Sequence, residues 1–343
     1  MKPLTVTMAS RPYDGVLPLA SGEVTIPGAE LKVTLDLNVP RVFGALYSGQ
    51  VDVSEMSLAE LIYYTSRGKA EFMGIPVFPS RVFRHGHIFY NTKSGIEGPS
   101  DLNGRKIGFQ RWVQTAGVWM RGILTDHYGV SPEKTPWYVA STHHWDDGSE
   151  DEIQPRDGSV IHRYSTSSVT GADNAHRALP DGEVDAIGVT EVQAPALLAN
   201  PSVRRVFEDF HAEERSYYER TRIFPIMHVL AMRKSLADEH PDLPGELFAA
   251  FSQSKRQVQQ RMGAIPSWTL AWKDRYLDLE RETFGGDLWP FGVAANKHVV
   301  DTFIGYCYNQ GIAAKHLEAR DLFFPSTRDL TEPTLSPSGK GLG

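Results

Sequence analysis

The chain of 343 residues has little of what signals disulfides, basic binding surfaces or membrane segments. Its single cysteine, Cys307, excludes an internal disulfide and any metal site built from several cysteines. Lysine and arginine number 35 against 42 acidic residues, and this net charge of −7 argues against nucleic-acid binding, which needs a basic surface. The longest apolar stretch, residues 223–232, contains a proline and a histidine and is too short to span a bilayer.

Several targeting and catalytic motifs are also missing. Lys2 is followed by no apolar block of the length that a secretory signal needs, so we expect a cytoplasmic protein without a membrane partner. The motifs G-x-G-x-x-G, P-loop, H-E-x-x-H and G-x-S-x-G are absent, which removes the usual support for nucleotide cofactors, zincins and α/β-hydrolases. Hydrophobic residues make up 41% and charged residues 22%, which is typical of a globular protein, and the length favours two lobes.

A short pattern occurs twice and predicts an α/β fold with two lobes built on one plan. Segments 49–68 and 182–198 each combine Gly-x-Val-Asp, a short strand, a turn with a hydroxyl side chain and an apolar helix. In the first copy, Ser57 and Glu60 have the spacing of a capping box at the start of the helix.

Two crossings of the chain between these lobes predict a hinged cleft. We expect lobe 1 to contain residues 1–92 and 223–325, and lobe 2 to contain residues 93–222. Residues 326–343 have the composition of a disordered tail. Residues 141–175 are poor in large apolar side chains and are predicted to form a long surface loop or lid.

The cleft should gather residues that follow strands and precede helices. Ligands of α/β sheets bind beyond the carboxyl ends of strands, close to helix N-termini. The residues that this topology places there are Glu55, Ser57, Trp112, Gln114, Thr115, Thr190 and Glu191.

A dense basic cluster lies at residues 78–91. It contains Arg81 and Arg84, whose guanidinium groups suit bidentate carboxylate binding, and His85 and His87, which suit acid–base chemistry. If the stretch from Arg84 onward is a strand, the two histidines share one face and Arg84 points to the other. The alternative is an exposed basic turn with one structural histidine.

A second cluster, residues 217–229, contains Arg222 and His228. His228 lies within an apolar strand pattern. A histidine in that setting is either a hydrogen-bonded core residue or a catalytic group, and the sequence leaves both interpretations open.

Five segments together resemble one known family. They are VDVSEMSLAELI (51–62), IPVFPSRVFRHGHIFYN (75–91), GVWMRGILTDHYGV (117–130), YYERTRIFPIMHV (217–229) and WPFGVAANKHVVDTFIGYCYNQGIA (289–313). In this order they resemble the 4,5-dihydroxyphthalate decarboxylases, which share the fold of type II periplasmic solute-binding proteins. The middle stretch 141–159 departs from the glycine-rich segment expected in relatives, so the substrate preference stays open.

The resemblance implies non-oxidative decarboxylation of 4,5-dihydroxyphthalate to protocatechuate and CO₂ in phthalate degradation. His85, with His228 as second choice, would donate the proton to the ring carbon. Glu55 or Glu191 would accept the phenolic proton, which requires a raised pKa. The substrate, a small aromatic dicarboxylate, would be held by Arg81, Arg84 and Arg222, with Ser57, Trp112, Gln114, Thr115 and Thr190 beside them.

This mechanism needs no organic cofactor, because the phenol itself supplies the electron density. A divalent metal stays an alternative, with His143 and His144 or the better-spaced His85 and His87 as candidate ligands, although a zinc-like site needs three or four convergent ligands. A second alternative is a solute-binding protein that captures an aromatic carboxylate without chemistry. A third is another enzyme of the same fold, such as the dihydroxynaphthoate-forming enzymes of menaquinone synthesis. The sequence is compatible with a homo-oligomer.

Overall fold

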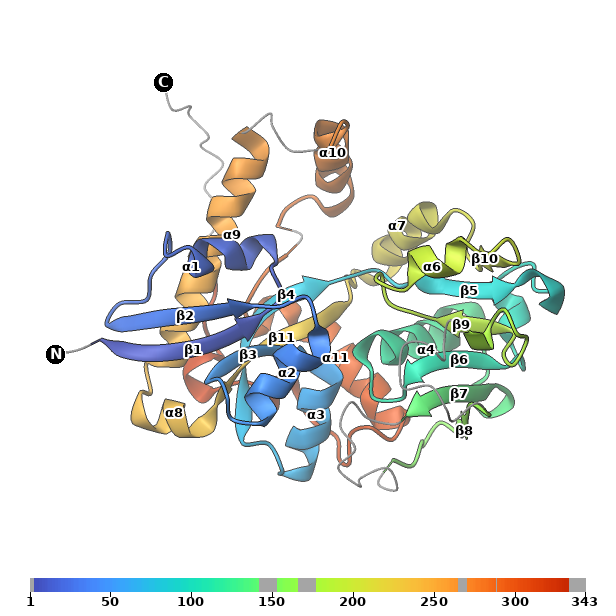
Figure 1. Cartoon of the computed structure of the whole chain (residues 1–343), viewed down its shortest axis with the longest axis horizontal. Coiled ribbons are helices and arrows are strands. Elements are labelled where there is room, and N and C mark those ends of the chain that lie inside the picture. Colours follow the sequence, from blue (N-terminus) through green and yellow to red (C-terminus); the bar gives the residue numbers. More distant parts are fainter. Residues whose placement is uncertain (1–2, 142–152, 166–176, 265–269, 288, 333–343) are drawn as a thin grey trace.

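The computed structural model describes residues 3–141, 153–165, 177–264, 270–287 and 289–332 of the chain. Figure 1 shows two α/β bodies side by side, each built around one sheet, and the chain passes between them more than once. Within the described ranges, every helix is too short or too polar to cross a membrane.

The first sheet has five strands in the order β2-β1-β3-β11-β4. Their bounds are β1 Leu4–Ser10, β2 Ala29–Leu35, β3 Val53–Ser57, β4 Phe72–Arg81 and β11 Ile226–Arg233. Strand β1 pairs in parallel with β2 and β3, whereas β11 runs antiparallel to β3 and β4. The late strand β11 is therefore inserted between two early strands, which ties the C-terminal half of the chain to the first body.

The second sheet has six strands in the order β10-β5-β9-β6-β7-β8. Their bounds are β5 Ile88–Asn91, β6 Ile107–Arg111, β7 Pro136–Ser141, β8 Val160–Arg163, β9 Ala186–Gly188 and β10 Val203–Arg205. Strands β6, β7, β8 and β9 are parallel, so their carboxyl ends share one edge. That edge is where ligands of such sheets bind.

Helices cover both sheets and connect the two bodies (Figure 1). They are α1 Leu17–Ala20, α2 Val39–Tyr47, α3 Leu58–Arg67, α4 Thr115–Tyr128, α6 Ala194–Leu198, α7 Phe210–Thr221, α8 Lys234–Glu239, α9 Leu243–Ala264, α10 Lys273–Phe284 and α11 Val293–Asn309. The predicted cap at Ser57 is confirmed, since its Oγ accepts from the Glu60 amide at 3.4 Å. The Glu60 carboxylate instead accepts from the Tyr47 hydroxyl.

Large buried aromatic side chains join the two bodies. Trp119 of α4 is fully buried, stacks on Phe303 of α11 with ring centroids 4.9 Å apart, and donates its indole N–H to the Ile226 carbonyl of the first sheet. One continuous apolar core therefore extends from the first sheet through α11 to α4 of the second body. Burial of this size is a major source of stability.

The crossing between the sheets differs from the one expected from the sequence. The strand from Arg84 that would place His85 and His87 on one face does not form, because residues 85–87 form a 3₁₀ turn and β5 begins only at Ile88. Strand β5 pairs with β9 and β10, so the chain enters the second sheet before Ile88 rather than after residue 92. We call residues 82–87 the connecting turn.

The expected disordered tail and the expected lid are each described by the structure only in part. Of the expected tail, residues 326–332 are ordered: Thr327 is fully buried and the Glu332 carboxylate contacts Lys255 Nζ at 2.5 Å. The expected lid, 141–175, includes β8, while residues 142–152 and 166–176 lie outside the described residues, as do 333–343.

Candidate functional site

A glutamate and a histidine from neighbouring strands form the centre of the candidate site. In the register of β3 and β11, His228 lies opposite Ser57, and Glu55 precedes Ser57 by two residues on the same face. Glu55 is fully buried, and its Oε2 lies 2.8 Å from His228 Nδ1. The His228 side chain is 15% exposed. The buried carboxylate thus orients an imidazole that keeps access to solvent.

Tyr13 completes this group from the loop that follows β1. Its hydroxyl lies 3.2 Å from His228 Nδ1 and also interacts with Glu55 and Ser80. Burial, followed by the Glu55 charge, raises the pKa of Tyr13 far above its usual value, so the phenol stays protonated. Phe43 packs edge-on against the His228 ring at 5.0 Å. The imidazole is therefore fixed by a carboxylate, a phenol and an aromatic edge.

Charged side chains from three segments meet at Glu191, which follows β9 in the second body. Its Oε2 lies 3.1 Å from Arg84 Nη1 in the connecting turn, and its Oε1 lies 3.8 Å from Arg11 Nη1 at the end of β1. Burial acts to raise the pKa of Glu191, but the Arg84 guanidinium and local hydrogen bonds hold it at about 2. The raised pKa expected of a Glu191 base is therefore contradicted.

Two helix N-termini, one from each body, meet beside the strands. The N-cap Ser57 of α3 and Thr115, the first residue of α4, have their hydroxyl oxygens 2.7 Å apart. The Thr115 hydroxyl also accepts from the Ala59 amide at 3.1 Å. Gln114, the N-cap of α4, donates its side-chain amide to Gln110 at 3.4 Å. Both positive helix ends and their hydroxyls thus lie at this junction.

The three arginines predicted as one clamp do not converge. Buried Arg81 donates to the carbonyls of Phe224 and Pro290 and to Asn296 Oδ1, so it fastens the first body together. Exposed Arg222 ends α7 in a left-handed conformation (φ 56°). Only Arg84, which is 3% exposed, lies with Glu191.

Two further predicted binding residues are engaged elsewhere. Trp112 is fully buried, donates its indole N–H to the Gln310 carbonyl and stacks under the Arg121 guanidinium at 3.8 Å. Thr190 donates its amide and hydroxyl to Gln193 Oε1, at 3.1 and 3.3 Å, in the turn that precedes α6.

His85, the first choice as proton donor, lies in an aromatic enclosure. Its ring packs against Tyr128, Phe207 and Tyr217 at 5.8, 5.2 and 5.1 Å, and neither ring nitrogen has a partner among the described residues. Burial, followed by nearby His127 and Arg220, lowers the pKa of His85 to about 3. A neutral imidazole in this setting is a poor acid at neutral pH. The rings that surround His85 are also different residues from those that contact Glu55 and His228.

This burial predicts a pH-dependent stability. The unfolded imidazole binds a proton with a pKa near 6.5 but the folded one only near 3, so acid favours the unfolded chain between these values. The contribution of His85 to the free energy of unfolding is fully present above pH ~6.5. Below that pH the free energy of unfolding should fall by up to ~1.4 kcal/mol per pH unit. Urea unfolding at pH 7 and pH 5 should show a smaller loss for His85→Phe than for the wild type. Equal losses would contradict this assignment.

The sequence analysis missed Arg11 and Tyr13. Both follow β1, and the rule that ligands bind beyond the carboxyl ends of strands was applied only to strands later in the chain. His87 was grouped with His85 as suited to acid–base chemistry but was given no step in the reaction. The Nδ1 of His87 is buried without a partner among the described residues, and its charge environment includes Arg84 and Glu191.

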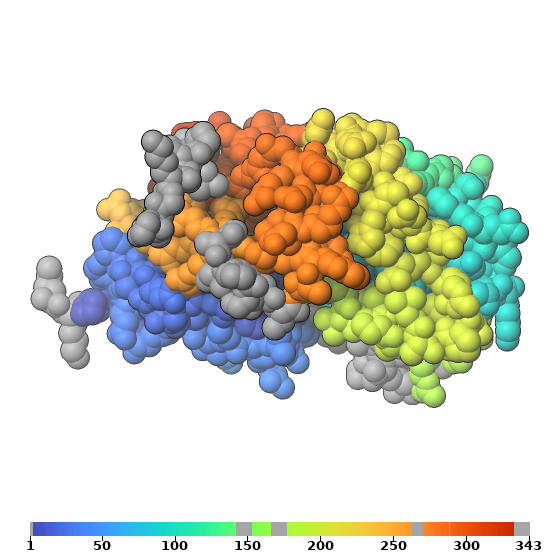
Figure 2. Space-filling model, turned by 90° about the horizontal axis from the view of Figure 1, so that it is seen from above, coloured from blue at the N-terminus to red at the C-terminus, as the bar shows by residue number. Residues whose placement is uncertain are grey.

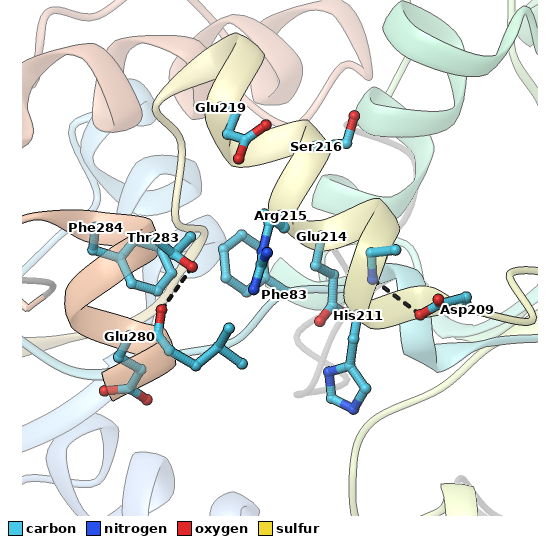
Figure 3. Close-up of a pocket in the computed structure, with 12 residues that line it drawn as sticks. Phe83, Asp209, His211, Glu214, Arg215, Ser216, Glu219, Glu280, Thr283 and Phe284 are labelled. Atoms are coloured by element: carbon cyan, nitrogen blue, oxygen red, sulfur yellow. Dashed lines mark hydrogen bonds between the residues drawn. The ribbon is translucent and has the colours of Figure 1, made fainter. Parts of the chain in front are cut away.

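A pocket of about 490 Å³ lies between α7 and α10, beside Phe83 of the connecting turn (Figure 3). In Figure 2 the α10 segment (orange) and the α7 segment (yellow) lie next to each other on the upper face. The Glu214 carboxylate points to the pocket and accepts from the Gly86 amide at 3.3 Å. None of the predicted site residues lines this pocket.

Metal ligands are the remaining question. Across the part of the chain that the structure describes, no three histidine, cysteine or acidic side chains are arranged to hold a metal ion. The candidate ligands His143 and His144 lie outside the described residues.

Curated relatives are found over most of this chain. A 4,5-dihydroxyphthalate decarboxylase of Comamonas testosteroni is 33% identical over 333 residues, which cover 95% of this chain and 98% of that protein. The chain belongs to the 4,5-dihydroxyphthalate decarboxylase family. A second protein of that name, from Pseudomonas putida, is 28% identical over 221 residues, covering 64% of this chain and 83% of that protein. No family model matches.

Solved structures show the fold of this decarboxylase-family chain. The aliphatic sulphonate-binding protein SsuA of Escherichia coli aligns with a TM-score of 0.53 at 15% identity, over 95% of this chain and 99% of that one. The desulfurization enzyme DSZB aligns with a TM-score of 0.55 at 15% identity, over 94% and 96%. At these identities the likeness concerns the fold alone. The predicted type II periplasmic-binding-protein-like fold is confirmed.

Proposed function

We propose that this protein decarboxylates a dihydroxylated phthalate, converting 4,5-dihydroxyphthalate into protocatechuate and CO₂. Membership in the decarboxylase family supports the reaction class. The observation that carries the proposal is the Glu55–His228 pair, which lies with Tyr13 and Arg11 at the junction of the two bodies. This group of residues combines an oriented histidine, which can carry a proton, with an arginine, which can bind a carboxylate.

The reaction needs a proton at the ring carbon that loses CO₂. Electron density from the hydroxyl para to that carbon enters the ring, and a new C–H bond forms. The bond to the carboxylate then breaks, its electron pair restores the aromatic ring, and CO₂ leaves. We assign proton donation to His228, because Glu55 at 2.8 Å orients its imidazole while the ring keeps access to solvent. The net change is one proton consumed and one CO₂ released.

The dianionic substrate needs positive groups in a site of low water content. Arg11 and Arg84 supply two guanidiniums, and the N-termini of α3 and α4 at Ser57 and Thr115 supply amide groups and a favourable dipole. Burial of these groups strengthens the interaction with carboxylates and disfavours the charged ground state relative to neutral CO₂. The distribution of cations therefore suits an aromatic dicarboxylate.

Incubation of the purified protein with 4,5-dihydroxyphthalate tests the proposal. We expect stoichiometric protocatechuate and CO₂, measured by chromatography and by trapping of the gas. Saturable binding without product would instead favour a solute-binding protein. A parallel reaction after chelator treatment separates metal-free from metal-assisted decarboxylation, since loss of rate on chelation with recovery on adding a divalent metal would establish the latter.

A further inference from the structure

The Glu191 carboxylate occupies a position that a ligand carboxylate would suit. Each of its oxygens faces a different guanidinium, Oε2 toward Arg84 at 3.1 Å and Oε1 toward Arg11 at 3.8 Å. Arg11 belongs to the first body, Arg84 to the connecting turn and Glu191 to the second body. The two arginines thus form a carboxylate site that a residue of the chain itself now fills.

The partners differ in their freedom to move. Arg84 is 3% exposed, and its Nε contacts Met227 Sδ at 3.1 Å, while the Arg11 side chain is 17% exposed and its amide donates to Glu55. The Glu191 side chain is 40% exposed and lies on a loop next to Val192, which is 71% exposed. The Arg84 guanidinium is therefore held in place and the backbone of Arg11 is anchored, whereas the more exposed Glu191 carboxylate has room to rotate toward solvent.

We propose that Arg11 and Arg84 form a carboxylate subsite and that Glu191 is its resident counterion, which one carboxylate of the substrate displaces. The identity of that substrate rests on the proposed function. Two guanidiniums that are largely removed from water are costly without a negative partner, so the empty protein needs Glu191 there. A ligand carboxylate relieves the same cost and can take its place.

This exchange has a consequence for selectivity. A neutral phenol such as catechol carries no charge to replace Glu191 on the arginines, so it should not compete for the subsite. Displacement of Glu191 costs free energy, so a carboxylate ligand binds with lower affinity than it would to the same arginines without Glu191. Because Glu191 comes from the opposite body, its release also removes the Arg11–Glu191 contact between the two bodies.

Phthalate binding to Glu191→Gln tests the proposal by calorimetry. Phthalate has two carboxylates and no hydroxyl to drive decarboxylation, so its affinity reports binding alone. We expect Kd for phthalate about tenfold lower in Glu191→Gln than in the wild type, because the competing charge is gone. The matched control Glu23→Gln removes a glutamate from a surface pair with Arg261 and should leave Kd unchanged. An unchanged or higher Kd in Glu191→Gln, or no saturable binding to either protein, overturns the proposal.

Two further measurements secure the result. Glu191→Asp keeps the charge and should remain within about threefold of the wild-type Kd, so a gain equal to that of the glutamine variant overturns the competition. The thermal midpoint of Glu191→Gln should be lower than that of the wild type without phthalate and should rise more when phthalate is added. If the wild type releases no protocatechuate while the affinity gain is observed, the proposed function fails and the subsite stands.

Discussion

His228→Gln is expected to lower kcat for 4,5-dihydroxyphthalate by about 10²–10⁴-fold, because general acid catalysis of this kind contributes that much. Glutamine can still hydrogen-bond to Glu55 but cannot carry a proton to the ring carbon. The protein should stay folded, since the His228 side chain is partly exposed and glutamine keeps a polar partner for Glu55. Single-turnover measurement of protocatechuate release, with phthalate Kd measured separately, distinguishes loss of chemistry from loss of binding.

Two comparisons make this prediction specific. His162→Gln changes a histidine that stacks on Tyr138 in the second sheet, at 5.1 Å, and should leave kcat unaltered. Glu55→Gln should also lower kcat, because a neutral amide replaces the charged acceptor that orients the His228 imidazole. An unaltered kcat in His228→Gln would remove the assigned proton donor.

The regular elements of this fold were predictable because they depend on local patterns. Ser57 begins α3 as its hydroxyl and spacing to Glu60 indicate, and α4 begins at Thr115 as expected. The connecting turn was not predictable in the same way. Its residues resemble a strand in composition, but tertiary packing of His85 against three rings fixes a 3₁₀ turn. Tertiary context overrides local propensity at this point.

The partners of charged side chains were the least predictable feature. Arg81 and Arg84 are three residues apart, yet one bonds to backbone carbonyls of the first body and the other to a glutamate of the second. No local pattern distinguishes them, because the distinction depends on segments 107 to 209 residues away in sequence. The same holds for His228, whose partner Glu55 comes from a strand 173 residues earlier.

Arg84→Met should weaken phthalate and substrate binding by about 2–5 kcal/mol, because it removes a buried cation that faces the carboxylate subsite. Methionine keeps the length and apolar character of the stem next to Met227, which limits the loss of packing. Calorimetric titration with phthalate measures the change, and an unaltered Kd would exclude Arg84 from the subsite.

Arg81→Met is the matched control, since it makes the same chemical change three residues earlier. It removes the donors to Phe224, Pro290 and Asn296, so the free energy of unfolding should fall by about 2–4 kcal/mol. The phthalate Kd of the folded fraction should stay close to that of the wild type. Urea unfolding and titration of both variants separate the two roles: an affinity loss in Arg81→Met equal to that in Arg84→Met would restore the clamp of neighbouring arginines.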